Sequence, residues 1–420
     1  MQARHPITRS LSKYRRSNSK RSGDPPMKSH IYKNLAIRSL WLFAGAMALA
    51  IQPLSAQAQS YKVLYSFTND NAAGEDPTSS LVRDPKGNLY GIALGGSFGR
   101  GIIFELGSTG DEQVLYNFKG SDGDGDVPDA MSFRDSAGNL FGTTFQGGAY
   151  SFGTVFKLDT QGSETVVYSF CPKTPCTEGA YPGGVTPGKN GTLYGITYAG
   201  GNFSCALTGC GTVFKINHDG DLTLLHAFGG ADGQAPNPGL VLDASNDAYG
   251  TTQYGGVYGR GVVFKVTAAG NETVEYSFSG GADGAYPNGG LVRDEEGNLY
   301  GTANQGGAYN YGTIFKITAL GRFTVLYSFP GGLSGANPYA DLNLDQQGNI
   351  FGVTDAGGGH NFGIVFKLDP GGNETVLHSF AEEADGVHPS GLIIDASGNL
   401  YGTTYQGGKH NHGSVFEVVP

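Results

Sequence analysis

The sequence predicts an all-β protein, a seven-bladed β-propeller of four-stranded antiparallel blades that forms one domain over residues 61–420. The first observation is an aromatic-glycine step that returns seven times, at intervals of 51, 53, 55, 51, 51 and 50 residues. The second is that each interval holds four short apolar stretches, and the third is that the two chain ends are out of phase with the repeat. A small antiparallel sheet copied at a fixed period is typical of a ring of blades. The steps are Tyr90-Gly91, Phe141-Gly142, Tyr194-Gly195, Tyr249-Gly250, Tyr300-Gly301, Phe351-Gly352 and Tyr401-Gly402.

The repeat that begins at Gly290 shows the four strands most clearly. They are predicted at residues 291–294, 298–303, 312–318 and 323–329, which are rich in Val, Ile, Tyr, Phe and Thr and bounded by Gly, Asp and Asn. No window of helical length interrupts them, so the pattern indicates strands alone. The first and second strands are joined by Asp-x-x-Gly-Asn, as at 294–298, which is typical of a type I turn followed by a positive φ at Gly.

Two aromatic features of the repeat predict its packing. A glycine inside a strand costs stability, so we expect the glycine of the aromatic-glycine step to mark the close approach of a neighbouring blade. The third and fourth strands each carry a recurring phenylalanine, and we expect these rings to fill the spaces between sheets. They are Phe104, Phe156, Phe214, Phe264, Phe315, Phe366 and Phe416 in the third strands, and Phe67, Phe118, Phe170, Phe228, Phe278, Phe329 and Phe380 in the fourth.

The chain ends predict how the ring closes. Residues 61–67 have the sequence of a fourth strand without a unit of its own, and residues 413–419 have the sequence of a third strand without a successor. Pairing the two completes the seventh blade and removes two exposed sheet edges, which would otherwise favour aggregation.

Residues 1–58 differ from the repeats and are predicted to be a signal peptide with a basic N-terminal extension. An uninterrupted apolar run covers residues 40–51, and Ala56-Gln57-Ala58 follows as a small-x-small cleavage site. The run is short for a membrane span, with a retained anchor as the alternative. Because Met27 begins a better-proportioned leader, we expect residues 1–26 to lie upstream of the native start or to be disordered. The protein is therefore expected to be secreted or periplasmic.

The charge of the remaining chain restricts its partners. Of the 27 Lys and Arg and the 37 Asp and Glu, ten basic residues and one acidic residue lie in 1–58, so residues 59–420 carry a net charge of −19. Such a surface argues against nucleic acid and against anionic membranes, and it favours a soluble monomer. All four cysteines lie near the third repeat, and an even number in an exported chain indicates disulfides. We predict the local pairs Cys171–Cys176 and Cys205–Cys210, with four-thiolate metal binding as the alternative.

Candidate binding residues lie on one face of the predicted disc, where all the long loops emerge. That face carries the connections between fourth and first strands and between second and third strands, and loops on a rigid scaffold often bind ligands. Each second-to-third connection has an aromatic or imidazole ring shortly after Gly-Gly. A ring of flat side chains could stack on sugars or peptide, or each could pin its own loop. The residues are Phe98, Tyr150, Phe203, Tyr258, Tyr309, His360 and His410.

Acidic and imidazole side chains on the same face suggest metal sites. The fourth-to-first loops carry a recurrent acid-Gly-x-x-Pro, which turn capping explains. The richest instance has alternate aspartates, a pattern able to wrap Ca²⁺, with a solvated acidic turn as the alternative: Asp122, Asp124, Asp126 and Asp129. Four histidines of the sixth and seventh repeats could ligate a transition metal or supply an acid/base pair, or be exposed turn residues: His360, His388, His410 and His412. Otherwise the sequence has no motif that requires a cofactor.

The phrases GNLYGTT, GGxxxxGTVFK and ETVLYSF resemble the GloVer tandem repeat of exported bacterial proteins, and copies cover nearly all of residues 61–420. The resemblance implies a repeat fold and export, and it carries no activity or site residues. We therefore expect a secreted binding or interaction module that meets a carbohydrate or protein ligand on the long-loop face. The alternative is an extracytoplasmic lyase or hydrolase that acts on polysaccharide at the central mouth of the ring.

Overall fold

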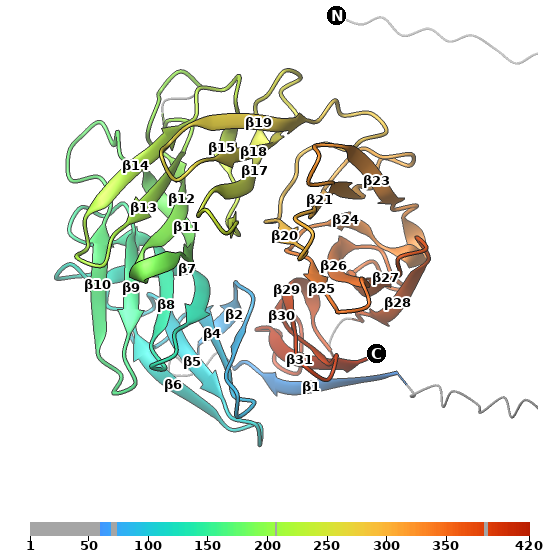
Figure 1. The fold of residues 1–420 in the computed structure, drawn as a ribbon. Coiled ribbons are helices and arrows are strands. Elements are labelled where there is room, and N and C mark those ends of the chain that lie inside the picture. The colour runs from blue at the N-terminus through green and yellow to red at the C-terminus, as the bar shows by residue number, and fades with distance from the viewer. Residues whose placement is uncertain (1–58, 69–73, 206–207, 382–384) are drawn as a thin grey trace, which may run out of the picture. The chain divides into compact units, whose positions relative to one another are not determined.

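The computed structural model describes residues 59–68, 74–205, 208–381 and 385–420, which lie in one compact unit. Seven antiparallel sheets surround a common axis (Figure 1), which confirms the predicted seven-bladed propeller. The predicted leader, residues 1–58, lies outside the described residues. Across the described ranges, no helix is long and apolar enough to cross a membrane.

The blades follow one another along the chain, and each is built from short strands with tight turns. Blades 1 to 4 consist of β2 (Glu75–Pro77), β3 (Val82–Arg83), β4 (Leu89–Leu94), β5 (Ile102–Leu106) and β6 (Glu112–Asn117); β7 (Gly125–Arg134), β8 (Leu140–Gly147), β9 (Thr154–Leu158) and β10 (Glu164–Ser169); β11 (Ala180–Pro187), β12 (Leu193–Ala199), β13 (Thr212–Ile216) and β14 (Leu222–Ala227); and β15 (Gln234–Pro236), β16 (Val241–Leu242), β17 (Ala248–Tyr254), β18 (Val262–Val266) and β19 (Glu272–Ser277).

Blades 5 to 7 repeat the arrangement. They consist of β20 (Val292–Arg293), β21 (Leu299–Ala303), β22 (Thr313–Ile317) and β23 (Phe323–Ser328); β24 (Ala336–Pro338), β25 (Asn343–Leu344), β26 (Ile350–Ala356), β27 (Ile364–Leu368) and β28 (Glu374–Ser379); and β29 (Val387–Ile394), β30 (Leu400–Gln406), β31 (Ser414–Val419) and β1 (Ser60–Ser66). Single 3₁₀ turns lie at Lys189–Gly191 and Gly332–Ser334. The first strand of each blade is innermost and the fourth is outermost (Figure 1).

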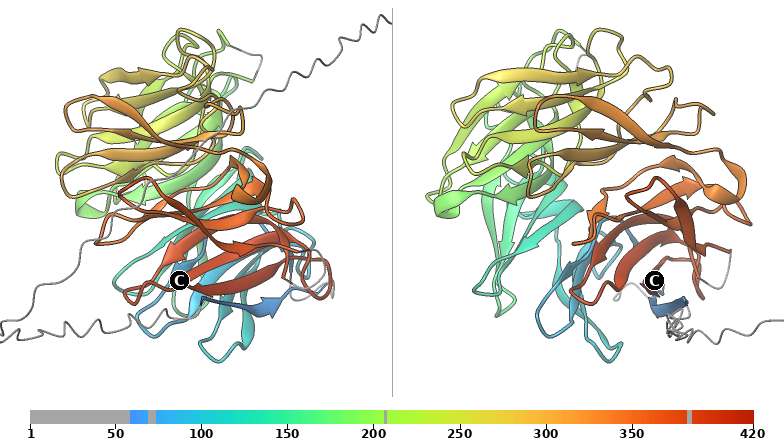
Figure 2. Two further views of the ribbon diagram at one scale, coloured as in Figure 1. Left: turned by 90° about the vertical axis from the view of Figure 1, so that its right-hand side faces the viewer. Right: turned by 45° about the vertical axis from the view of Figure 1, so that its right-hand side comes forward.

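The N-terminal strand closes the ring as predicted. β1 pairs antiparallel with β31, from Ser60 opposite Val419 to Ser66 opposite Ser414, and the Phe67 N–H donates to the Gly413 carbonyl at 3.0 Å. Both figures of the fold show β1 beside β31 near the C-terminus (Figures 1 and 2). The seventh blade therefore takes its outermost strand from the other end of the domain.

The recurring phenylalanines form the core between blades, as expected. All fourteen are fully buried, and each outer-strand ring meets the inner ring of the following blade edge-to-face, at centroid distances of 5.0–5.3 Å. Such pairs add about 1 kcal/mol each beyond the area they bury. The same contact occurs at all seven junctions: Phe67–Phe104, Phe118–Phe156, Phe170–Phe214, Phe228–Phe264, Phe278–Phe315, Phe329–Phe366 and Phe380–Phe416.

The glycine of the aromatic-glycine step has a different close neighbour from the one expected. Gly250 lies opposite Phe264 on the adjacent strand of its own blade, and a Cβ at Gly250 would lie 2.6 Å from the Phe264 Cζ. The other six steps repeat this geometry. The glycine therefore makes room for a ring of the same sheet, and that ring in turn packs against the neighbouring blade.

Both predicted disulfides are present. Cys171–Cys176 closes the loop between β10 and β11, and Cys205–Cys210 closes the loop between β12 and β13. The Asp-x-x-Gly-Asn turns also form as expected: Asp294 Oδ1 accepts the Asn298 N–H at 2.7 Å, and Gly297 has a φ of 87°.

Candidate functional site

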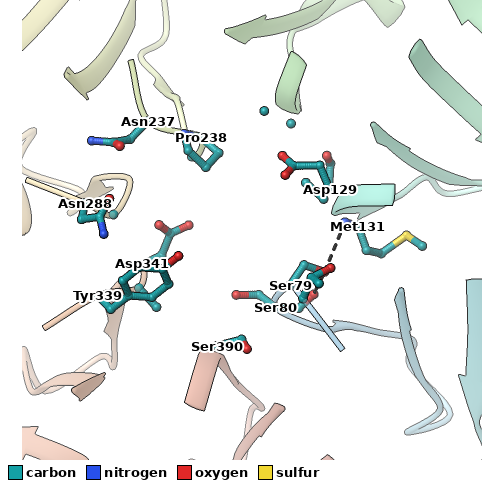
Figure 3. Close-up of a pocket in the computed structure, with 18 of the residues that line it drawn as sticks. Ser79, Ser80, Asp129, Met131, Asn237, Pro238, Asn288, Tyr339, Asp341 and Ser390 are labelled. Atoms are coloured by element: carbon teal, nitrogen blue, oxygen red, sulfur yellow. Dashed lines mark hydrogen bonds between the residues drawn. The ribbon is translucent and has the colours of Figure 1, made fainter. Parts of the chain in front are cut away.

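A polar channel of about 540 Å³ runs along the propeller axis, with walls that come from the innermost strands of all seven blades (Figure 3). The volume falls in the range of about 300–1,000 Å³ that small-molecule sites occupy. The channel is the place where the seven repeats meet, so each repeat contributes side chains to it.

A repeated proline positions the wall of the channel. The proline near the start of each innermost strand packs against the glycine that precedes the third strand of the preceding blade: a Cβ at Gly312, for example, would lie 2.5 Å from the Pro338 Cδ. The residue before each proline has a positive φ of 49–61° although none is glycine, a conformation that costs stability. These seven residues are Asp76, Val127, Tyr181, Ala235, Tyr286, Asn337 and His388.

The residue directly after each proline lines the channel. Side chains that hold the repeat together recur in every blade, whereas this position carries six different residue types in seven copies. The backbone conformation around this position is the same in each blade. The variation therefore changes the side chains that line the channel and not the fold of the blade. The residues are Thr78, Asp129, Gly183, Asn237, Asn288, Tyr339 and Ser390.

Two carboxylates give the channel its electrostatic character. Asp129 and Asp341 face the opening from opposite walls (Figure 3). Burial raises the pKa of Asp129 to about 6, against a hydrogen bond from the Tyr198 hydroxyl at 3.3 Å. Burial also raises the pKa of Asp341, whose Oδ1 accepts the Gly290 N–H. No Lys, Arg or His lies among the described residues that line the channel, so no cation of the protein there offsets these charges.

The other polar side chains of the channel wall differ in their exposure and in the hydrogen bonds that they already make within the protein. Asn237 is 5% exposed and donates to Thr251 Oγ1 and to the Pro287 carbonyl, so it joins two blades. Tyr339 is 47% exposed, and Asn288 accepts only a long hydrogen bond, 3.4 Å, from Gln253. Tyr339 and Asn288 are therefore able to bind a ligand, whereas Asn237 is structural.

Family models identify the repeat. The model of the Gloeobacter/Verrucomicrobia repeat matches residues 50–208, 132–343 and 203–416 in overlapping stretches that cover the propeller. The chain belongs to this family. The resemblance seen in the repeat phrases is thereby confirmed. A sequence comparison of this Gloeobacter/Verrucomicrobia repeat protein with curated proteins finds no match.

Three solved structures similar to this family member show the fold alone, because each is under 25% identical. The extracellular domain of the putative hybrid two-component system BT3049 from B. thetaiotaomicron has a TM-score of 0.56 and 15% identity, over 86% of this chain and 41% of its own. That of BT4673 from the same organism has a TM-score of 0.53 and 12% identity, over 85% and 39%. Puromycin hydrolase has a TM-score of 0.50 and 12% identity, over 79% and 50%. The chain thus spans about two fifths of the length of the sensor domains.

The loop aromatics predicted from the sequence are exposed and lie outside the channel. Phe98, Tyr150, Phe203, Tyr258 and Tyr309 are 40–60% exposed, and His360 and His410 are exposed as well. Three of these tyrosines lie near enough to the outer-strand tyrosine of their own blade to raise its pKa. These three tyrosines therefore belong to the outer part of the disc, and ligand binding by the seven loop residues stays a prediction.

The predicted acidic calcium site is divided between different roles. Asp124 accepts hydrogen bonds from the Tyr116 hydroxyl and the Lys119 N–H, and Asp126 pairs with Arg100 at 2.8 Å. Asp129 lies in the channel, and Asp122 is exposed. Turn capping by the recurrent loop acid is seen directly, since Asp124, Asp232, Asp283 and Asp385 each accept a hydrogen bond from a backbone N–H of their own loop.

Two of the four predicted metal-binding histidines, His388 and His412, pair with different acids, and His360 and His410 are exposed. His388 Nδ1 lies 2.8 Å from Asp355 Oδ1, and His412 Nδ1 lies 3.2 Å from Glu75 Oε2. Over the part of the chain that the structure describes, neither these histidines nor the four aspartates form a group of three ligands; His226, Asp232 and Glu272 do. Metal binding at the two sequence-predicted places stays a prediction, whereas the group of three was missed.

The sequence did contain a signal for the channel. The signal is that the residue after the proline varies from repeat to repeat. The loop rings, in contrast, recur at the same place in every repeat. Asp341, two residues beyond that position, had no comparable signal, because its orientation depends on how the innermost strands converge.

Proposed function

We propose that the protein is an extracytoplasmic binding module that holds a neutral, polyhydroxylated ligand, a short oligosaccharide, in the axial channel. The observation that carries the proposal is the position after the repeated proline, where seven identical frames present Thr, Asp, Gly, Asn, Asn, Tyr and Ser to one cavity. The ligand enters from the face that carries the long loops.

The chemistry of the wall matches sugar hydroxyl groups. Each hydroxyl both donates and accepts a hydrogen bond, so carboxylates, amides and hydroxyls at the wall can all pair with it. Tyr198 and Tyr339 add flat apolar surface against which a sugar ring can pack. Two carboxylates without a basic residue in the described wall disfavour an anionic ligand, whose charge they would repel.

Two disulfides support a location outside the cytoplasm, because reducing conditions inside the cell disfavour them. The predicted signal peptide agrees with this location. Similar folds occur in the extracellular domains of sensor systems, which is a likeness of fold.

A glycan-array screen of the purified chain, followed by calorimetry on the glycans that bind, tests the proposal. Asp341→Asn and Tyr339→Ala should each weaken binding at least about tenfold, a loss of ~1.4 kcal/mol. Tyr258→Ala, an exposed loop ring far from the wall, is the matched control and should bind like the wild type. A ligand lost with Tyr258 and kept by both channel variants would move the site to the loops, and an array without binders would exclude the oligosaccharide class.

A hydrolase acting on a polysaccharide is the second candidate, and the pKa of Asp129 favours it. A carboxyl group with a pKa of about 6 can hold a proton near neutral pH and donate it to a leaving group. If the channel is catalytic, release of reducing ends from a bound glycan should disappear in Asp129→Asn while binding is retained. A wild-type protein that binds a glycan and leaves it intact would dismiss this candidate.

A further inference from the structure

The outer edges of neighbouring blades meet through one repeated contact, which we call the rim triad. It consists of the residue two before the outer-strand phenylalanine, the acid of the following loop, and the first residue of the next blade's outermost strand. Between blades 1 and 2 these are Tyr116, Asp124 and Glu164. The Tyr116 hydroxyl donates to Asp124 Oδ2 at 3.1 Å, and Glu164 lies close enough to raise the pKa of Tyr116.

The rim triad between blades 3 and 4 has a different composition. Its members are His226, Asp232 and Glu272, so an imidazole replaces the phenol of Tyr116 while both acids are kept. His226 Nε2 lies 2.9 Å from Asp232 Oδ2, and one ligand atom from each of the three residues lies within 4.8 Å of the others. The other histidine at this position, His378, instead stacks on Tyr61 with 3.6 Å between the ring centroids, and among the described residues no group of three ligands forms around His378 and Asp385.

The hydrogen bonds within this triad leave acceptor atoms facing the imidazole. Asp232 Oδ1 accepts the Gly229 N–H at 2.7 Å, which leaves Oδ2 for the histidine side. Glu272 Oε1 is buried and has no hydrogen-bond partner among the described residues. The side chains of His226 and Asp232 are 18% and 26% exposed, so an ion has access from solvent.

Neighbouring loops fix the geometry of this triad. The Ser204 hydroxyl donates to the Gly229 carbonyl at 3.2 Å, and a Cβ at Gly230 would lie 3.3 Å from Cys205 Sγ. The disulfide Cys205–Cys210 therefore holds one loop of blade 3 against the loop that carries Asp232. A site held in place before the ion arrives loses little conformational entropy on binding.

We propose that His226, Asp232 and Glu272 bind a divalent transition-metal ion, best matched by Zn²⁺, that links blade 3 to blade 4. One imidazole nitrogen and two carboxylate oxygens are ligands that Zn²⁺ commonly takes, and water completes four-coordination. The ion neutralises two neighbouring carboxylates, one of them with an unpaired buried oxygen. The site lies at the outer edge of the disc, and its role is to stabilise the junction.

The rim triad between blades 1 and 2 supplies the test. His226→Tyr recreates the Tyr-Asp-Glu composition of the blade 1–2 junction, so it should keep the fold and the hydrogen bond to Asp232 while losing the nitrogen ligand. After loading with Zn²⁺ and dialysis, elemental analysis should find the ion in the wild type and not in His226→Tyr. Added Zn²⁺ should raise the Tm of the wild type alone, because an ion that binds only the folded state stabilises it.

Two further variants keep the proposal falsifiable. Glu272→Gln, which removes one charge with little change of shape, should weaken Zn²⁺ binding in calorimetry at least about tenfold. Tyr116→His places an imidazole between Asp124 and Glu164 and should add a second Zn²⁺ per chain. A wild type that takes up no Zn²⁺, or a His226→Tyr variant that binds it equally well, would overturn the proposal; a Tyr116→His variant without a second ion would show that the three positions do not suffice.

Discussion

At the scale of single residues, Asp129 shows that the channel is built at the expense of stability. No Lys, Arg or His lies among the described residues of the channel wall, and burial raises the pKa of the Asp129 carboxyl group from the ordinary 3.8 to about 6. A folded state that holds the proton more tightly than the unfolded chain loses stability as pH rises from about 4 to about 6, and the loss is complete above that range. Residues that weaken the fold and remain in it are candidates for function.

Asp129→Asn should therefore stabilise the protein at neutral pH. The amide keeps the shape and avoids burying a charge, which by the size of the pKa shift corresponds to roughly 3 kcal/mol at most. The Tm should rise at pH 7.5 and change little at pH 4, measured by differential scanning calorimetry at both pH values.

Asp294→Asn is the control, because it is expected to change the Tm in the opposite direction. Hydrogen bonds from Asn298 hold the pKa of Asp294 below its usual value, although burial acts against them. Its replacement should lower the Tm at pH 7.5 and have little effect well below its pKa. An Asp129→Asn variant that melts lower than the wild type at pH 7.5 would contradict the reading of the channel carboxylates.

Gly250 tests the packing of the aromatic-glycine step. Gly250→Ala would place a methyl group 2.6 Å from Phe264 Cζ and 2.8 Å from Leu240 Cδ2, so the ring must shift. We expect a loss of about 2 kcal/mol in the free energy of unfolding, measured with denaturant.

Gly107→Ala is the matched control for Gly250→Ala. Gly107 has no positive φ, and a Cβ there would have its nearest neighbour at 3.5 Å, an ordinary contact. The change should cost less than about 0.5 kcal/mol. Equal losses at the two positions would mean that Phe264 does not require glycine opposite it.

At the scale of strands, the sequence periodicity predicted where the strands lie. It did not predict the breaks within the innermost strands. The predicted closing strands 61–67 and 413–419 correspond to β1, Ser60–Ser66, and β31, Ser414–Val419. The innermost strands differ: in blades 1, 4 and 6 they are split into two short pieces on either side of the residue after the proline. A positive φ precedes the proline in all seven blades, including blades 2, 3 and 7, where the innermost strand is continuous, so it does not by itself explain the split. The apolar pattern contains no sign of this conformation.

Deletion of residues 59–68 tests β1. Without β1, one edge of β31 is unpaired and Phe104 loses its partner Phe67, so the product should aggregate or associate, as size-exclusion chromatography would show. Addition of a synthetic peptide with the sequence of residues 59–68 should restore a soluble monomer. A deletion variant that is monomeric and melts cooperatively at the wild-type temperature would show that β1 does not close the ring.

At the scale of the whole molecule, the repeat separates folding from binding. The Phe–Phe junctions, the proline contacts and the glycine steps recur in all seven blades and hold the ring. The channel collects a position of each blade that varies, the residue after the proline. The closed ring could be predicted because local patterns specify every blade. The variable position after the proline is visible in the sequence, whereas its place in a shared channel is not, because these side chains converge only after closure.

The central claim is that the side chains of the channel wall other than Asn237, which joins two blades, bind the ligand and are not needed for the fold. A combined variant, Asp129→Asn, Asn288→Ala, Tyr339→Ala and Ser390→Ala, tests it against the glycan found on the array. The account predicts cooperative unfolding at or near the wild-type Tm together with a loss of glycan affinity of at least about 100-fold, ~2.7 kcal/mol. The same glycan bound with unchanged affinity by this folded variant would contradict the account.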